Sequence, residues 1–170
     1  MENTLLSINQ VLKKLIGSHR QLLDVVREEK ACLVQADLSK IQTATRAKEG
    51  LIEEIHQFES ARLKLMTELS IEWKRPLKEL SLTQLIIAIQ GSDPLGADQL
   101  RSNLNALTVL IQRITEQNQD SQAWIERSLV HIRQMNKNVM GEAAAKSSTY
   151  TQQGQRSAGL KPSKYISKEI

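Results

Sequence analysis

The sequence is poor in cysteine, proline, glycine and aromatic residues. Of its 170 residues, one is cysteine, three are proline, seven are glycine, and aromatic side chains make up 3%. The single cysteine, Cys32, cannot form an internal disulfide, which fits a reducing compartment. Proline and glycine are the strongest helix breakers. Their scarcity, beside 40% hydrophobic residues that are mostly aliphatic, predicts an all-α protein with an aliphatic core.

Long apolar runs are also absent. The longest run, residues 85–89, has five residues, whereas a membrane-spanning helix needs about 20. The first ten residues, MENTLLSINQ, lack the charged and then apolar order of a signal peptide. We therefore expect no membrane span and a cytoplasmic location.

Positive charge is too thinly spread for a nucleic-acid-binding protein. The net charge is +4, and residues 141–170 carry five lysines or arginines and two glutamates. The rest of the chain is therefore close to neutral. Nucleic-acid binders use a dense basic stripe, often with aromatic side chains on which bases stack. The sequence predicts no nucleic-acid partner.

Motifs of catalysis and metal binding are missing. There is no glycine-rich phosphate loop, nucleophile elbow or cysteine pair. One Glu-x-x-His step, Glu53 to His56, resembles half of a di-iron site, but neither His19 nor His131 supplies the second copy. We expect no enzymatic activity, no metal and no cofactor.

Apolar residues at alternating spacings of three and four predict long helices with one apolar side. The helices are expected at 3–34, 38–69 and 96–140, with a short helix at 82–89. The first two form an elongated antiparallel hairpin, and the third completes a coiled-coil-like three-helix bundle. We expect a bundle domain at 1–140 and a flexible, disordered basic tail at 141–170. The last stripe comprises Leu100, Leu104, Leu107, Ile111, Ile114, Asn118, Ser121, Ile125, Ser128, Ile132, Met135 and Val139.

Local signals place the ends of these helices. Asp37 can cap the second helix, so a hairpin turn is expected at residues 35–37. Pro76 disfavours helical geometry in the residue before it and ends that helix. Ser81 and Gln84 form a capping-box pattern at the start of the short helix. Residues 91–96, GSDPLG, mark the next break.

Charged residues on the hairpin are interpreted as structural polar pairs. Folding the chain around residues 35–37 brings Lys48 level with Asp24 and within reach of Glu28 or Glu29. Arg62 lies on the same face of the second helix. Such pairs contribute little stability but can fix the register of two helices. Asn118, a polar residue in the last stripe, either sets register in the same way or takes part in binding.

Residues 22–66 resemble the flagellar export chaperones of the FlgN type. The resemblance extends along most of the chain, although Ser121 stands where family members often carry a second asparagine. The residues on which this resemblance is based occur in the family's order and spacing. They are a Leu-Leu pair at 22–23, then Glu29, Leu33 and Asp37, then Lys48, Leu51 and Ile52, then Arg62, Asn118, and Tyr150 followed four residues later by Gly154.

This resemblance implies a chaperone of hook–filament junction proteins of the FlgK and FlgL type, which delivers them to the export gate protein FlhA. Tyr150 and Gly154 would then bind the gate. The second half of the last helix would bind cargo, because its stripe is partly polar and the helix is expected to extend beyond the hairpin. Its apolar residues there would then have no partner within the chain. In the absence of cargo, the chain could form a homo-oligomer. The alternative function is a structural coiled-coil tether or scaffold. The predicted cargo-binding residues are Asn118, Ile125, Leu129, Ile132, Met135 and Val139.

Overall fold

The computed structural model describes residues 2–146 of the chain, and the side chains of residues 3–139. Helices and the turns between them account for this whole part, which contains no strand, so the predicted all-α class is confirmed. The chain divides into two units, Met1–Ala123 and Trp124–Ile170. In chain order the elements are α1 (Glu2–Gln35), α2 (Leu38–Glu72), the 3-10 helix η1 (Leu77–Glu79), α3 (Leu82–Ile89) and α4 (Pro94–Lys146).

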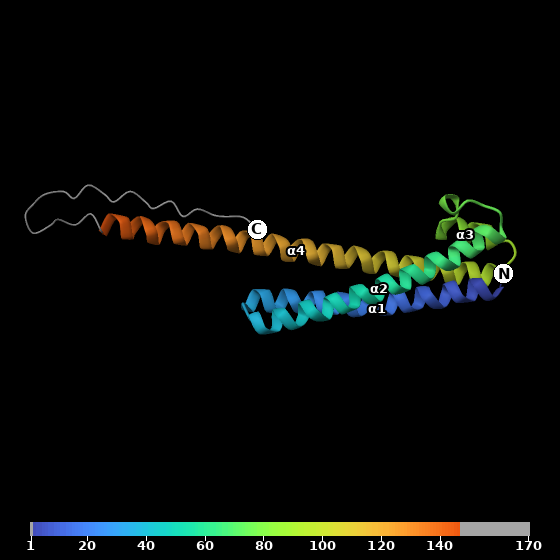
Figure 1. The fold of residues 1–170 in the computed structure, drawn as a ribbon, viewed down its shortest axis with the longest axis horizontal. Helices are drawn as coiled ribbons and strands as arrows, with labels where there is room; N and C mark the ends of the chain where they lie inside the picture. The colour runs from blue at the N-terminus through green and yellow to red at the C-terminus, as the bar shows by residue number, and fades with distance from the viewer. Residues whose placement is uncertain (1, 147–170) are drawn as a thin grey trace, which may run out of the picture. The chain divides into compact units, whose positions relative to one another are not determined.

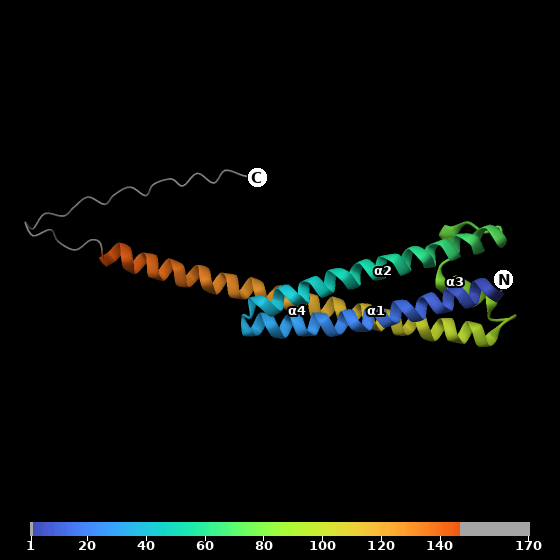
Figure 2. The ribbon, with the colours of Figure 1, turned by 60° about the horizontal axis from the view of Figure 1, so that its bottom comes forward.

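Unit 1 contains the predicted helical hairpin and the first part of α4. Helices α1 and α2 run antiparallel, and the first part of α4 lies beside them (Figures 1 and 2). Helix α3 lies at the end of the hairpin where α1 begins and α2 ends (Figure 1). All four helices contribute to one aliphatic core, as the scarcity of aromatics predicts. Its members with at most 2% exposure are Ile8, Leu12, Leu15, Met66, Leu69, Leu85, Ile89, Ala97 and Leu100.

A tight turn of two residues joins α1 to α2. Asp37 N–H donates to the Cys32 carbonyl and Ala36 N–H to the Leu33 carbonyl, both at 3.2 Å. This pattern is a Schellman motif, which places its next-to-last residue in the left-handed region. Ala36 accordingly has φ 54°. The turn explains why the hairpin closes where the first apolar stripe weakens.

Glycine would suit this turn better than alanine does. Replacing Ala36 by glycine is expected to raise the free energy of unfolding by about 0.5–1 kcal/mol, because glycine has no Cβ to clash in the left-handed conformation. Urea denaturation measures the change. Ala47, exposed inside α2, is the matched control, since Ala47→Gly should lower the same free energy by about 1 kcal/mol. A loss of stability in both variants would contradict the assigned turn geometry.

Asp37 caps α2 as predicted. Its Oδ1 accepts a hydrogen bond from Lys40 N–H at 3.2 Å. This hydrogen bond favours the charged carboxylate and holds the pKa of Asp37 below its ordinary value. The cap therefore contributes fully above that ordinary pKa and is lost as the pH falls through the lowered one.

A second Schellman motif ends α2 just before Pro76. Arg75 N–H donates to the Ser70 carbonyl at 3.0 Å and Lys74 N–H to the Ile71 carbonyl at 3.2 Å. Lys74 takes the left-handed conformation, with φ 51°. The helix is interrupted just before Pro76, as the sequence predicts. Its last residue, Glu72, lies three positions beyond the expected end at residue 69. The short helix η1 that follows Pro76 was not predicted.

Helix α4 begins and ends outside its predicted bounds of 96 and 140. It starts at Pro94, because Asp93 caps it by accepting a hydrogen bond from Gly96 N–H at 2.9 Å and proline suits the first helical position. A Cβ on residue 96 would clash with the Asp93 carboxylate, which would then have to move out of its capping position. The helix continues to Lys146 through Glu142 and three alanines, which are good helix formers.

Candidate functional site

Four polar residues from the three long helices of unit 1 meet beside the aliphatic core. We call Glu29, Thr45, Lys48 and Asn118 the polar cluster. Lys48 Nζ lies 2.8 Å from Glu29 Oε2 and donates to Asn118 Oδ1 at 3.3 Å. Thr45 Oγ1 donates to Glu29 Oε1 at 3.4 Å. Lys48 therefore links α2 to both α1 and α4.

Two other charged residues predicted on the hairpin pair within their own helices. Asp24 lies 3.6 Å from Arg27, and it is Glu29 that Lys48 contacts. Arg62 contacts Glu59 at 2.8 Å. Lys30 of α1 also reaches Asp120 of α4, at 2.9 Å. The polar cluster and this ion pair match hydrogen-bond donors to acceptors, so their chemistry fits a role in setting helix register.

A second polar group, which the sequence analysis missed, joins α1 to α4. Asn9 Nδ2 donates to Gln99 Oε1 at 2.7 Å, and Asn103 donates to Asn9 Oδ1. The sequence contained an indication that Asn9 lies at the edge of a helix contact, because it directly follows the stripe residue Ile8 on a helix whose apolar side is broad. Its pairing with residues 90 positions away could not be read from that pattern.

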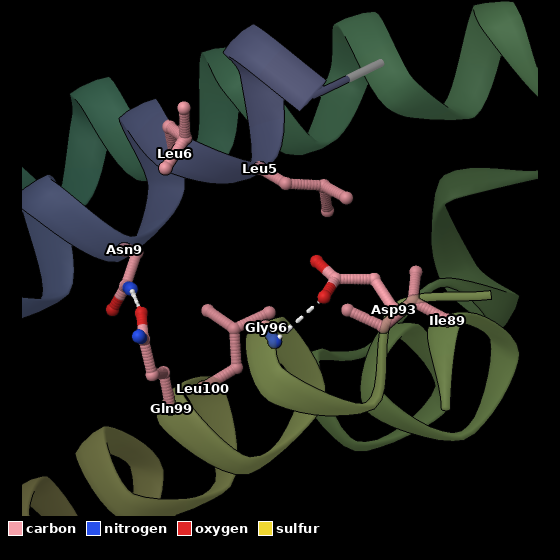
Figure 3. A pocket seen from close by; sticks show the side chains of 8 residues that line it. All are labelled: Leu5, Leu6, Asn9, Ile89, Asp93, Gly96, Gln99 and Leu100. Atoms are coloured by element: carbon pink, nitrogen blue, oxygen red, sulfur yellow. Dashed lines mark hydrogen bonds between the residues drawn. The ribbon is translucent and has the colours of Figure 1, made fainter. Parts of the chain in front are cut away.

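A small pocket lies next to this amide group. It has a volume of about 140 Å³, and Figure 3 shows Leu5 and Leu6 of α1 on one side and Asp93 and Gly96 at the start of α4 on the other. Its walls are mainly aliphatic, and one oxygen of Asp93 is already used by the helix cap. The pocket holds no combination of nucleophile, base or paired carboxylates.

The histidines and acidic residues of the described part do not form a metal site. His19 is buried, with Nδ1 2.8 Å from the Leu15 carbonyl oxygen. His56 is exposed, and Glu53 accepts a hydrogen bond from Gln57 at 3.4 Å. Among the side chains that the structure describes, residues 3–139, no three from histidine, cysteine, aspartate or glutamate gather closely enough to hold a metal ion.

In unit 1 the aliphatic stripe residues of α4 are buried or half-buried apart from Ile111, which is 46% exposed, whereas those of unit 2 are exposed. Leu100, Leu107 and Ile114 are buried in the core clusters of unit 1. In unit 2, five large aliphatic side chains recur at spacings of three and four, which places them on one side of the helix. We call them the apolar face: Ile125 (39% exposed), Leu129 (45%), Ile132 (52%), Met135 (54%) and Val139 (64%).

The residues predicted to bind cargo or the export gate thus fall into three groups. Asn118 lies in unit 1, where it takes part in the polar cluster. The other five predicted cargo-binding residues make up the apolar face of unit 2. Tyr150 and Gly154 lie outside the described residues.

None of the helices in the described part combines the length and the apolar character that crossing a bilayer requires.

Comparison with known proteins supplies one finding. A search of curated proteins and a search of solved structures each returned no match. The family model described as FlgN protein matches residues 1–158, which is most of the 170-residue chain. This match shows that the chain, with its long helices, its polar cluster and its apolar face, belongs to the FlgN family, the family of flagellar export chaperones.

Proposed function

We propose that this protein is a cytosolic chaperone for the hook–filament junction proteins of the FlgK and FlgL type. It covers their amphipathic terminal helices, prevents these helices from associating too early, and delivers the proteins to the flagellar type III export gate. Membership of the FlgN family supports the general role. The identity of the cargo and the delivery step are proposals that rest on the resemblance to FlgN-type chaperones, and the chemistry of the chain fits them.

The single observation that carries the cargo proposal is the apolar face of unit 2. Its five aliphatic side chains are each between 39% and 64% exposed. A contiguous exposed apolar surface commonly marks a binding site. Its spacing of three and four residues matches the helix-in-groove and coiled-coil modes of recognition, in which an amphipathic helix lays its own apolar stripe along the surface.

The same mode of binding suits a cargo that must be released. A terminal segment that becomes ordered only on binding loses conformational entropy, and this loss offsets part of the interaction free energy. The resulting complex can hold its cargo in solution and still give it up at the gate.

Calorimetric titration of the full chain with the terminal helix of a junction protein tests the cargo proposal. We expect saturable binding with a negative heat-capacity change, because apolar surface is buried. The central globular part of the same junction protein serves as the control and should not bind. Absence of binding to every terminal helix tested, together with growth of the chain into rods with concentration, would favour the structural tether instead.

Delivery to the gate is assigned to Tyr150 and Gly154, which lie outside the described residues. Tyrosine offers a rigid ring for a pocket and a hydroxyl for a polar group within it. Gly154 would allow the backbone to approach closely. In FlgN-type chaperones, to which this sequence is similar, the Tyr-x-x-x-Gly mark is tied to the cytosolic domain of FlhA.

Replacing Tyr150 by alanine is expected to weaken binding of the chaperone–cargo complex to the gate domain by about 2 kcal/mol, the usual size of a hot-spot truncation. Cargo binding should not change. The chain's other tyrosine, Tyr165, is the matched control, and Tyr165→Ala should leave gate affinity as it is. Equal gate affinities for the wild type and Tyr150→Ala would remove the assigned role.

A further inference from the structure

The charged residues around the apolar face follow a pattern. If Ile125, Ile132 and Val139 are taken as heptad positions a, Ser128 and Met135 occupy positions d. Lysine, arginine, aspartate and glutamate are absent from the flanking e and g positions of residues 124–139. The e positions hold Leu129 and Asn136, and the g positions hold Trp124, His131 and Asn138.

All four charged residues of this segment lie at positions b, c or f, away from the apolar face. They are Glu126, Arg127, Arg133 and Lys137. A helix is about 10 Å across with its side chains, which is close to the distance over which physiological salt screens exposed charges. These four side chains therefore have little influence on a helix that packs against the apolar face.

The e and g positions are where coiled coils discriminate between partners. Opposite charges there attract a chosen partner, and like charges repel a wrong one. Unit 1 of the same chain does use ion pairs between its helices, at Lys48–Glu29 and Lys30–Asp120. There the neighbours of each helix are fixed by the fold. The flanks of the apolar face carry no such pairing groups.

We propose that the apolar face selects helices by their apolar stripe and does not discriminate by the sign of the charges beside it. This inference rests on the proposed function and defines its substrate class. The ligand is an amphipathic helix with an aliphatic stripe at heptad spacing, and acidic, basic and neutral flanks are all accepted. Because apolar burial is the main attraction, the affinity depends only weakly on ionic strength.

Three synthetic peptides test this selectivity on the full chain. Each is three heptads long with the same leucine and isoleucine stripe, and its e and g positions are all glutamine, all glutamate or all lysine. Fluorescence anisotropy at pH 8, where histidine is generally neutral, measures binding in about 0.15 M and about 0.5 M salt. We expect the three dissociation constants to agree within about fivefold and each to change less than about threefold with salt. A larger spread or a larger salt effect overturns the inference.

A pair of double variants shows whether the e and g positions are the determinants. Asn136→Glu with Asn138→Glu adds two charges beside the stripe. This variant should prefer the lysine peptide over the glutamate peptide by about fivefold more than the wild type does, as expected from two exposed ion pairs. Val130→Glu with Gln134→Glu adds two charges at positions f and c and should leave the preference unchanged. Equal preferences in the two variants would show that the bound helix does not lie beside the e and g positions, and this result overturns the inference.

Titration with a junction protein's terminal helix separates this inference from the proposed function. If the terminal helix binds and the peptides are discriminated by charge, the proposed function stands and the inference fails. If neither the terminal helix nor any peptide binds, the proposed function fails and the inference falls with it.

Discussion

Replacing Ile132 and Met135 together by aspartate is expected to abolish binding of a junction protein's terminal helix, with an affinity loss of at least about 100-fold. Both side chains are more than half exposed in unit 2, and neither belongs to the core clusters of unit 1. In a complex they would become buried. Burying a carboxylate without a partner costs several kcal/mol, which exceeds the loss required for a 100-fold effect.

The same double variant should leave the fold of unit 1 nearly unchanged. Aspartate lowers helix propensity by less than about 1 kcal/mol per position, so a small loss of helicity in unit 2 is the most that we expect. Circular dichroism and thermal melting of the free chain measure this effect, and calorimetry measures cargo binding. The matched control, Val130→Asp with Gln134→Asp, adds two carboxylates to the other side of the helix and should retain cargo affinity.

Two outcomes would contradict the assignment of the apolar face. Unfolding of the whole chain by Ile132→Asp with Met135→Asp, but not by the control, would show that these side chains belong to a core. Unchanged cargo affinity in a folded variant would show that cargo binds elsewhere.

Replacing Leu85 by alanine is expected to lower the free energy of unfolding by about 2–5 kcal/mol, the range for a buried leucine truncated to alanine. Leu85 is fully buried and belongs to the main core cluster, together with Met66 and Leu69 of α2. Helix α3 has eight residues, too few to be stable alone in water. Its stability must come from this packing.

Ile87 provides the control on the same helix. Its side chain is exposed, so Ile87→Ala should change the free energy of unfolding by less than about 1 kcal/mol. Urea denaturation followed by circular dichroism compares the two variants. Similar small effects at both positions would mean that α3 is not part of the core of unit 1.

The sequence by itself determined the secondary structure because the signals involved are local. The apolar spacing of three and four residues, the cap at Asp37 and the break at Pro76 all act within a few neighbouring residues. These signals are sufficient for the all-α class, the hairpin and most helix ends. The two Schellman motifs were harder to predict from the sequence, because alanine and lysine stand where glycine is usual. Neither Ala36 nor Lys74 is a residue type that favours the left-handed conformation.

Tertiary structure decided which residues meet across the bundle. From the sequence, Lys48 could reach Asp24, Glu28 or Glu29, and the rotation and offset of two packed helices select Glu29. The Asn9, Gln99 and Asn103 group depends on the same geometry, since Asn9 of α1 lies 90 and 94 positions from its two partners on α4.

Exposure of the apolar stripe is likewise a property of the folded chain. In sequence, Ile114 and Ile132 belong to the same apolar stripe, yet Ile114 is buried among Leu22, Leu23 and Val26, while Ile132 is half exposed. Periodicity records only which side of a helix is apolar. Whether that side is buried in a core or left open to bind another helix depends on which other helices pack there.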